Sequence, residues 1–91
     1  MVGYSVEKEA LKRRLARIEG QIRGIARMVD EDRYCIDVLT QIAAVQAAIE
    51  QVALGLVDGH VRHCMANAST EEKDEKADEL VAAVGRLLKS A

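Results

Sequence analysis

The fold is decided by the long apolar stretch at residues 35–66, CIDVLTQIAAVQAAIEQVALGLVDGHVRHCMA. Residues that favour helices dominate it and proline is absent, so we predict one helix of about 45 Å at the standard rise per residue. A helix of that length is long for a chain of 91 residues, and other helices must cover it. Because the rest of the chain shares this composition, we predict an all-α fold.

Two faces of this predicted helix are apolar. One face has the alternating four- and three-residue spacing of paired helices. Its positions are Cys35, Leu39, Ile42, Gln46, Ile49, Ala53, Leu56, His60 and His63. The other face is predicted to meet the first helix, and its positions are Val38, Val45, Val52 and Val57.

Two further helices flank the long one. The first is predicted to begin at Ser5, a good N-cap, and to end at a charged turn over residues 30–33. Its apolar stripe consists of Leu11, Leu15, Ile18, Ile22, Ile25 and Val29. The third helix is predicted after Ser69, which precedes Glu72 at the spacing of a capping box.

Residues 1–91 are predicted to form a single domain, because the chain is short and contains no linker. The two cysteines and the lack of an apolar leader predict a cytoplasmic protein with reduced thiols. No uncharged apolar run approaches the length of a membrane span, so we expect no contact with a membrane.

Charge is distributed unevenly along the chain, although the net charge is only −2. Residues 8–27 hold seven basic and two acidic side chains, whereas residues 71–79 hold six acidic and two basic ones. The first helix is therefore a candidate surface for the phosphates of a nucleic acid. Its candidate residues are Lys12, Arg13, Arg14, Arg17 and Arg23. The solvated face of an ordinary amphipathic helix explains the same pattern equally well.

Three potential ligands for a soft metal ion lie on the long helix: Cys35, His60 and Cys64. His60 and Cys64 are four residues apart and share a helix face. Cys35 lies about 37 Å from His60 along a continuous helix, so one ion cannot reach all three in a single chain. The separation is nearly a whole number of turns, so Cys35 and His60 project in the same direction. Two chains packed antiparallel therefore bring Cys35 of one beside His60 and Cys64 of the other, in two equivalent sites.

The chemistry of these ligands suits Cu(I), because two thiolates and one imidazole form a soft set of few donors. Structural zinc normally needs a fourth ligand. His63 is a candidate for that position or for the place of Cys64, although its position beside the pair favours a bystander. Taken singly, either cysteine is more often a small core residue than a ligand. No catalytic arrangement stands out, which argues against an enzyme.

Three stretches carry a family resemblance: RLARIEGQIRGI at 14–25, YCIDVLTQI at 34–42 and HVRHC at 60–64. In these stretches, and over nearly all of its length, the chain resembles the copper-sensing repressors of the CsoR group, which are all-helical bacterial DNA-binding proteins. The family's Cys, His and Cys ligands correspond to Cys35, His60 and Cys64.

The resemblance implies a Cu(I)-responsive repressor that binds operator DNA without metal and releases it when copper binds. It also implies a dimer of dimers with a DNA surface on the basic residues of the first two helices. Two residues are expected to support the ligands, Tyr34 beside Cys35 and Glu79 on the third helix. Nickel and cobalt sensors of the wider superfamily add an N-terminal histidine and replace the last thiol with histidine. This chain has Val-Gly-Tyr-Ser at 2–5 and retains Cys64.

A thiol chemistry remains the alternative. Persulfide sensors of the superfamily keep two cysteines but lack the ligand histidine, which makes His60 the discriminating residue. The alternative function is a cytosolic thiol or persulfide sensor, or a helical metal buffer, that uses Cys35 and Cys64.

Overall fold

The computed structural model describes residues 3–90, which are helical apart from short turns. The 3-10 turn η1 (Ser5–Glu7) leads into α1 (Lys8–Asp30). Helix α2 (Cys35–Gly59) continues directly into a π-helical turn, η2 (His60–Met65), and α3 (Thr70–Ser90) follows. No strand occurs over residues 3–90, and the predicted all-α protomer of three helices with a long second helix is confirmed.

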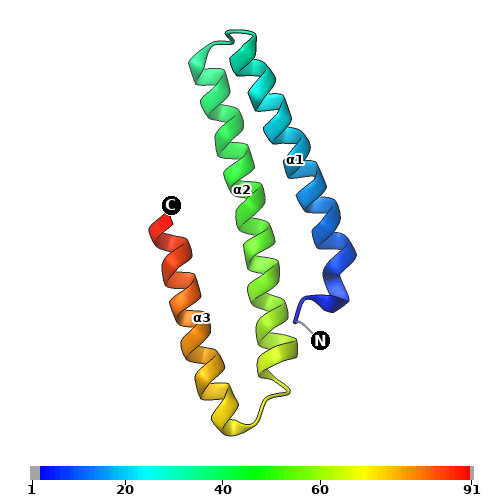
Figure 1. The fold of residues 1–91 in the computed structure, drawn as a ribbon, viewed down its shortest axis with the longest axis vertical. Helices are drawn as coiled ribbons and strands as arrows, with labels where there is room; N and C mark the ends of the chain where they lie inside the picture. Colours follow the sequence, from blue (N-terminus) through cyan, green and yellow to red (C-terminus); the bar gives the residue numbers. More distant parts are fainter. Residues whose placement is uncertain (1–2, 91) are drawn as a thin grey trace. The chain divides into compact units, whose positions relative to one another are not determined.

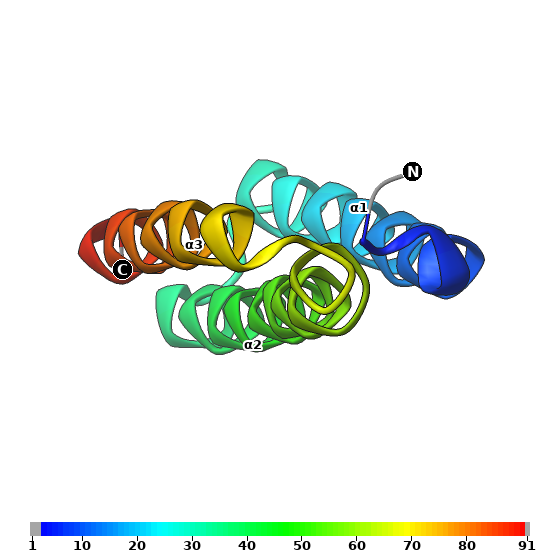
Figure 2. The same ribbon diagram turned by 90° about the horizontal axis from the view of Figure 1, so that it is seen from below.

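The chain forms two compact units. One unit, residues 7–55, is a hairpin of α1 and most of α2, which lie side by side and antiparallel (Figure 1 and Figure 2). The other unit joins the N-terminal residues up to Val6 with the end of α2, η2 and α3. That residues 1–91 form a single domain stays a prediction.

Four side chains form the buried core of the hairpin: Leu11 and Ile18 from α1, and Val45 and Val52 from α2. The two members of each pair are seven residues apart, so each helix presents one side chain every two turns to the same seam. Leu11 also lies against Gly55, where a Cβ would be 3.3 Å from the Leu11 Cδ2 atom. The prediction that the valine face of α2 meets the first helix is therefore confirmed for Val45 and Val52.

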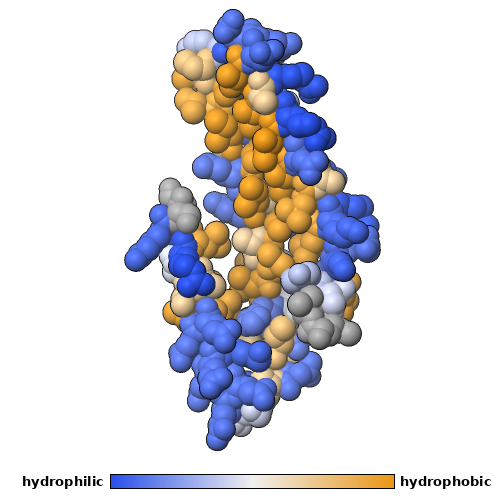
Figure 3. All heavy atoms as spheres, in the orientation of Figure 1, coloured by the Kyte–Doolittle hydropathy of each residue, from blue (hydrophilic) through white to orange (hydrophobic). Residues whose placement is uncertain are grey.

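Much of the remaining apolar surface is uncovered in the single chain. On α1 the exposed members of the predicted stripe are Leu15, Ile22 and Val29. On α2 the exposed apolar side chains include Leu39, Ile42, Ile49 and Leu56, all from the face predicted for helix pairing. Figure 3 shows hydrophobic residues gathered along the hairpin, with hydrophilic residues on its outer edge. The hairpin thus buries only one of the two apolar faces of α2.

The helix formed by α2 and η2 is long and apolar enough to cross a membrane, by length and composition alone. Within Cys35–Met65, one window of 18 residues has a mean hydropathy of 1.3, and 11% of that window is buried. Every such window contains the charged residue Glu50, which is why no uncharged run of that length occurs in the sequence. The central helix of a soluble helical assembly meets the same criterion, so length and hydropathy alone do not separate the two cases.

The helix ends follow the sequence in part. Ser5 begins η1 and does not cap α1, whose N-cap is Glu7 without a side-chain hydrogen bond. Such 3-10 turns are frequent at the beginning of α-helices. In the turn between α1 and α2, Asp32 has a φ of 56°, a left-handed conformation that aspartate tolerates better than most residues. The cap predicted for the third helix is confirmed, because the Ser69 hydroxyl accepts a hydrogen bond from the Glu72 amide at 3.2 Å.

The core assignment predicts that Val52→Ala lowers the free energy of unfolding by about 2 kcal/mol, because it removes buried carbon atoms and leaves a cavity. Val52 is 7% exposed, whereas Val81 on α3 is 72% exposed. The matched control Val81→Ala should change the free energy by less than about 0.5 kcal/mol. Urea denaturation of both variants at one protein concentration makes the comparison. Equal losses in the two variants would contradict this core.

Candidate metal centre

The turn that carries His60 and Cys64 is a π-helix, where the sequence predicted an unbroken α-helix. The Ala66 amide donates to the carbonyl of Val61, five residues earlier, at 3.3 Å. π-helical turns are rare and occur frequently at functional sites. On an α-helix, side chains four residues apart are offset by about 40° around the axis. His60 and Cys64, four residues apart, project from one side of this turn.

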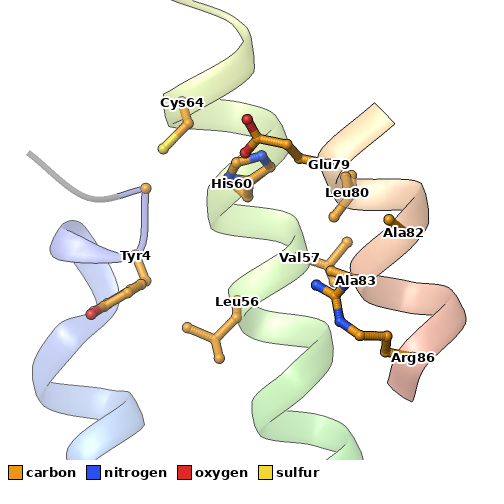
Figure 4. A pocket seen from close by; sticks show the side chains of 11 residues that line it. Tyr4, Leu56, Val57, His60, Cys64, Glu79, Leu80, Ala82, Ala83 and Arg86 are labelled. Carbon is orange, nitrogen blue, oxygen red and sulfur yellow. The ribbon is translucent and has the colours of Figure 1, made fainter. Parts of the chain in front are cut away.

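His60 and Cys64 line one pocket of about 720 Å³ within the second unit. Both side chains are half-buried. The Glu79 carboxylate on α3 lies toward the His60 ring (Figure 4). Arg86 also lines the pocket and was not among the predicted site residues. The remaining wall is mostly apolar and consists of Gly3, Tyr4, Leu56, Val57, Leu80, Ala82 and Ala83. The structure thus brings together two predicted ligands and one of their two expected supporting residues.

Val57 is placed differently from its prediction. The sequence assigned it to the surface that meets the first helix, but it lines the pocket together with residues of α3. It therefore contributes to the candidate centre and not to the buried core of the hairpin, whose members lie earlier in α2.

Cys35 and Tyr34 belong to the other unit, at the turn between α1 and α2. Cys35 is the first residue of α2, and its side chain is exposed. The Tyr34 carbonyl accepts hydrogen bonds from the amides of Asp37 and Val38 at 3.0 and 3.2 Å, which anchors the backbone in the first turn of the helix. The Tyr34 side chain itself is 66% exposed. Over residues 3–90, no three His, Cys, Asp or Glu side chains gather into a group that could hold a metal ion.

His63 lies on the same π-turn but does not line the pocket. Its side chain is half-buried, and its backbone carbonyl accepts a hydrogen bond from the side-chain amide nitrogen of Asn67 at 2.8 Å. Its participation in metal binding stays a prediction, with the bystander role favoured by this position.

Two glycines bring the N-terminal segment against the π-turn, a contact that was not predicted from the sequence. A Cβ on Gly3 would lie 2.6 Å from the Gly59 carbonyl oxygen and 2.9 Å from the Cys64 sulfur. A Cβ on Gly59 would lie 2.8 Å from the Gly3 carbonyl oxygen. Both glycines are buried. The only signal in the sequence was Gly59, one of two glycines within the predicted long helix.

The basic residues predicted to contact phosphate are all exposed on α1. Lys12 pairs with Glu9 at 3.7 Å, and Arg23 pairs with Glu19 at 2.9 Å. Exposed pairs of this kind contribute little to stability and are easily exchanged. Three candidates form no ion pair within the described part of the chain: Arg13, Arg14 and Arg17.

Sequence comparison relates nearly the whole chain to known regulators. The profile of a family described as metal-sensitive transcriptional repressors matches residues 7–86. The copper-sensing transcriptional repressor RicR of Mycobacterium tuberculosis is 52% identical over 91 residues, which cover 97% of this chain and 95% of that protein. The copper-sensing transcriptional repressor CsoR of Bacillus subtilis is 53% identical over 73 residues, which cover 80% of this chain and 72% of that protein.

Solved structures show the same relationship. The copper-sensing repressor CsoR with Cu(I) from Geobacillus thermodenitrificans has a TM-score of 0.82 at 44% identity, covering 92% of this chain and 88% of that chain. The nickel-responsive transcriptional regulator InrS has a TM-score of 0.73 at 40% identity, covering 86% and 89%. Because regulators that respond to different metals have this fold, the metal must be argued from the ligands.

Proposed function

The chain belongs to the metal-sensitive transcriptional repressors, in the CsoR family of copper sensors, and from this premise we propose that it is itself a Cu(I)-responsive repressor. In this proposal the metal-free protein binds operator DNA, and Cu(I) releases it and relieves repression of copper-resistance genes. The family implies a regulator and not an enzyme. The observation that carries the proposal is the pair His60 and Cys64, which present an imidazole and a thiol to one pocket from a π-turn.

Copper fits the proposed ligands Cys35, His60 and Cys64 better than nickel does. Cu(I) is soft and binds thiolates in sites with few donors, whereas Ni(II) favours nitrogen and oxygen donors in square-planar or tetragonal arrangements. We propose that Glu79 holds the His60 side chain in place and that Tyr34 holds the backbone beside Cys35. Nickel remains the competing metal to test, because InrS has the same fold.

The third ligand is proposed to come from a second chain packed antiparallel. The face of α2 that carries the pairing positions is apolar and uncovered, with Ile42, Ile49 and Leu56 exposed to 38%, 44% and 39%. Ala47 and Ala48 lie level with the midpoint of this face along the helix axis, but Ala48 packs against the buried core of the hairpin, so the proposed helix crossing rests on the exposed apolar row itself. Two such dimers form the proposed tetramer. The apolar surface of α2 is then covered by protein, and we place the repressor in the cytoplasm, where its DNA is.

Operator DNA is proposed to contact the basic residues of α1. Arg13, Arg14 and Arg17 are exposed and form no ion pair within the described residues, so binding phosphate breaks no existing interaction there. Lys12 and Arg23 each form one exposed ion pair, which contributes little to stability and can be replaced by a contact with phosphate. In a tetramer each contact is repeated, which strengthens a surface that is modest in one chain.

The first functional prediction concerns release of DNA. Genomic fragments retained by the metal-free protein serve as the probe, and one Cu(I) per chain should release them in a gel-mobility assay, whereas Ni(II) should not. His60→Ala should still bind copper through the two thiolates, and still bind DNA, but should not release it, because the coupling free energy between the sites, typically about 1–3 kcal/mol, is lost.

Two results contradict this prediction. If the wild-type complex persists at saturating Cu(I), the buffer function based on Cys35 and Cys64 becomes the better account. If His60→Ala releases DNA as readily as the wild type, His60 does not couple the two sites, and a thiol-based switch replaces the proposal.

The second prediction tests the shared site. Cys35→Ala and Cys64→Ala chains should each lose tight Cu(I) binding, because every site in either pure dimer lacks one thiolate. Co-refolding the two variants should restore tight binding at about a quarter of all sites, since half of the randomly formed dimers are mixed and each has one intact site. Competition with a Cu(I) chelator measures the recovery. Cys64→Ala refolded alone is the control, and no recovery in the mixture means that the ligands do not come from two chains.

The third prediction concerns the DNA surface. Arg14→Gln and Arg17→Gln should each weaken DNA binding and reduce the salt slope by about one for every phosphate that is no longer neutralised. Lys89→Gln on α3 removes the same charge from an exposed position and serves as the control. Fluorescence anisotropy at several salt concentrations gives both quantities. An unchanged slope in the arginine variants would assign these residues to an ordinary solvated helix face.

A further inference from the structure

We propose that Gly3 and Gly59 form a clamp that holds the N-terminal segment over the Cys64 sulfur and leaves the pocket as the route to that thiol. A small ion then reaches Cys64 from the pocket, whereas bulky thiol-reactive compounds are hindered. The meaning of this selectivity rests on the proposed function, in which Cys64 is a Cu(I) ligand. The shielding itself is a property of the metal-free chain.

The clamp is a contact between two backbones. The site of a Cβ on each glycine is occupied by backbone atoms of the other, at 2.6 Å from the Gly59 oxygen and 2.8 Å from the Gly3 oxygen. A real Cβ does not come within 3.0 Å of such atoms, and backbone cannot rotate away as a flexible side chain can. A larger residue at either position must therefore separate the segment from the turn.

Position 59 requires glycine because the Gly3 backbone occupies the place of a Cβ, and not because of the backbone conformation. Its φ of −62° and ψ of −39° are helical, so alanine fits the backbone there equally well. Glycine costs a helix about 1 kcal/mol relative to alanine. The close approach of Gly3 is the structural feature that offsets this cost.

The clamp closes one side of the sulfur. A Cβ on Gly3 would be 2.9 Å from the Cys64 sulfur, so the Gly3 backbone lies beside that atom. Figure 4 shows the sulfur directed toward the N-terminal segment. Cys64 also lines the pocket, which leaves that side open. The two proposed thiol ligands therefore differ in solvent access: Cys35 is exposed, whereas Cys64 is half-buried.

This difference determines which chemistry reaches the site. The reactivity of a cysteine depends on access as well as on its thiolate fraction. A bare ion needs only the open pocket side, whereas attack on an organic disulfide or a bulky electrophile needs room around the sulfur. Gly3 and Gly59 therefore act as specificity-determining residues that favour a metal ion over organic thiol reagents.

The test measures alkylation of Cys64 in the full-length, metal-free Cys35→Ser chain by mass spectrometry. Iodoacetamide is the small reagent and fluorescein maleimide the bulky one. Gly59→Ala and Gly3→Ala should each accelerate the bulky reagent about tenfold and the small one about threefold or less, because alkylation no longer waits for local opening of the segment. Gly85→Ala is the matched control, since a Cβ there meets no atom within 4 Å, and its rates should match those of the parent chain.

Two outcomes overturn the clamp. Unchanged rates in Gly3→Ala, which alters only the terminal segment, show that the segment does not cover the sulfur. Equal acceleration of both reagents shows a change in thiol reactivity or general unfolding, which circular dichroism distinguishes. Failure of wild-type protein to release DNA with Cu(I) would refute the proposed function and leave the alkylation result in force.

Discussion

The packing of Val45 and Val52 against α1 determines where the rest of α2 faces. A helix turns by about 100° per residue, so the row that contains Ile42 and Ile49 lies about 60° around the axis from the valine row. Once the valines are buried in the hairpin, that neighbouring row must face outward, and both of its isoleucines are exposed. The hairpin core thereby creates the surface on which a second chain is proposed to pack.

In the proposed function, the metal ligands and the chain interface use the same face of the long helix that the sequence predicts. The outward row of α2 begins at Cys35, and η2 continues the helix with His60 and Cys64. A chain of this size buries a modest fraction of its surface alone, and the proposed association would supply apolar burial that the hairpin lacks. Ligands from two chains then link metal binding to pairing, because anything that binds only the paired state stabilises it.

Helix periodicity predicted the features that depend on the order of side chains along one helix. It located three helices, the buried positions Val45 and Val52 and the Ser69 cap, and four-residue spacing paired His60 with Cys64 before the pocket was known, whereas Val57 was assigned to the wrong surface. It missed the π-turn, because a change from four-residue to five-residue backbone hydrogen bonding over one turn does not alter the spacing of apolar residues in the sequence. It also missed the contact of Gly3 with Gly59, which depends on backbone atoms far apart in sequence and involves no side chain.

The division of the chain into two units has a consequence for the order of folding. Residues 7–55 are contiguous and joined by a short turn, so their contacts close a small loop and form quickly. The other unit joins Gly3 to residues that follow the whole hairpin, and its loop-closure entropy is larger. Loop closure therefore favours formation of the hairpin first, and we expect the surroundings of Cys64 to be the last part of the molecule to take shape.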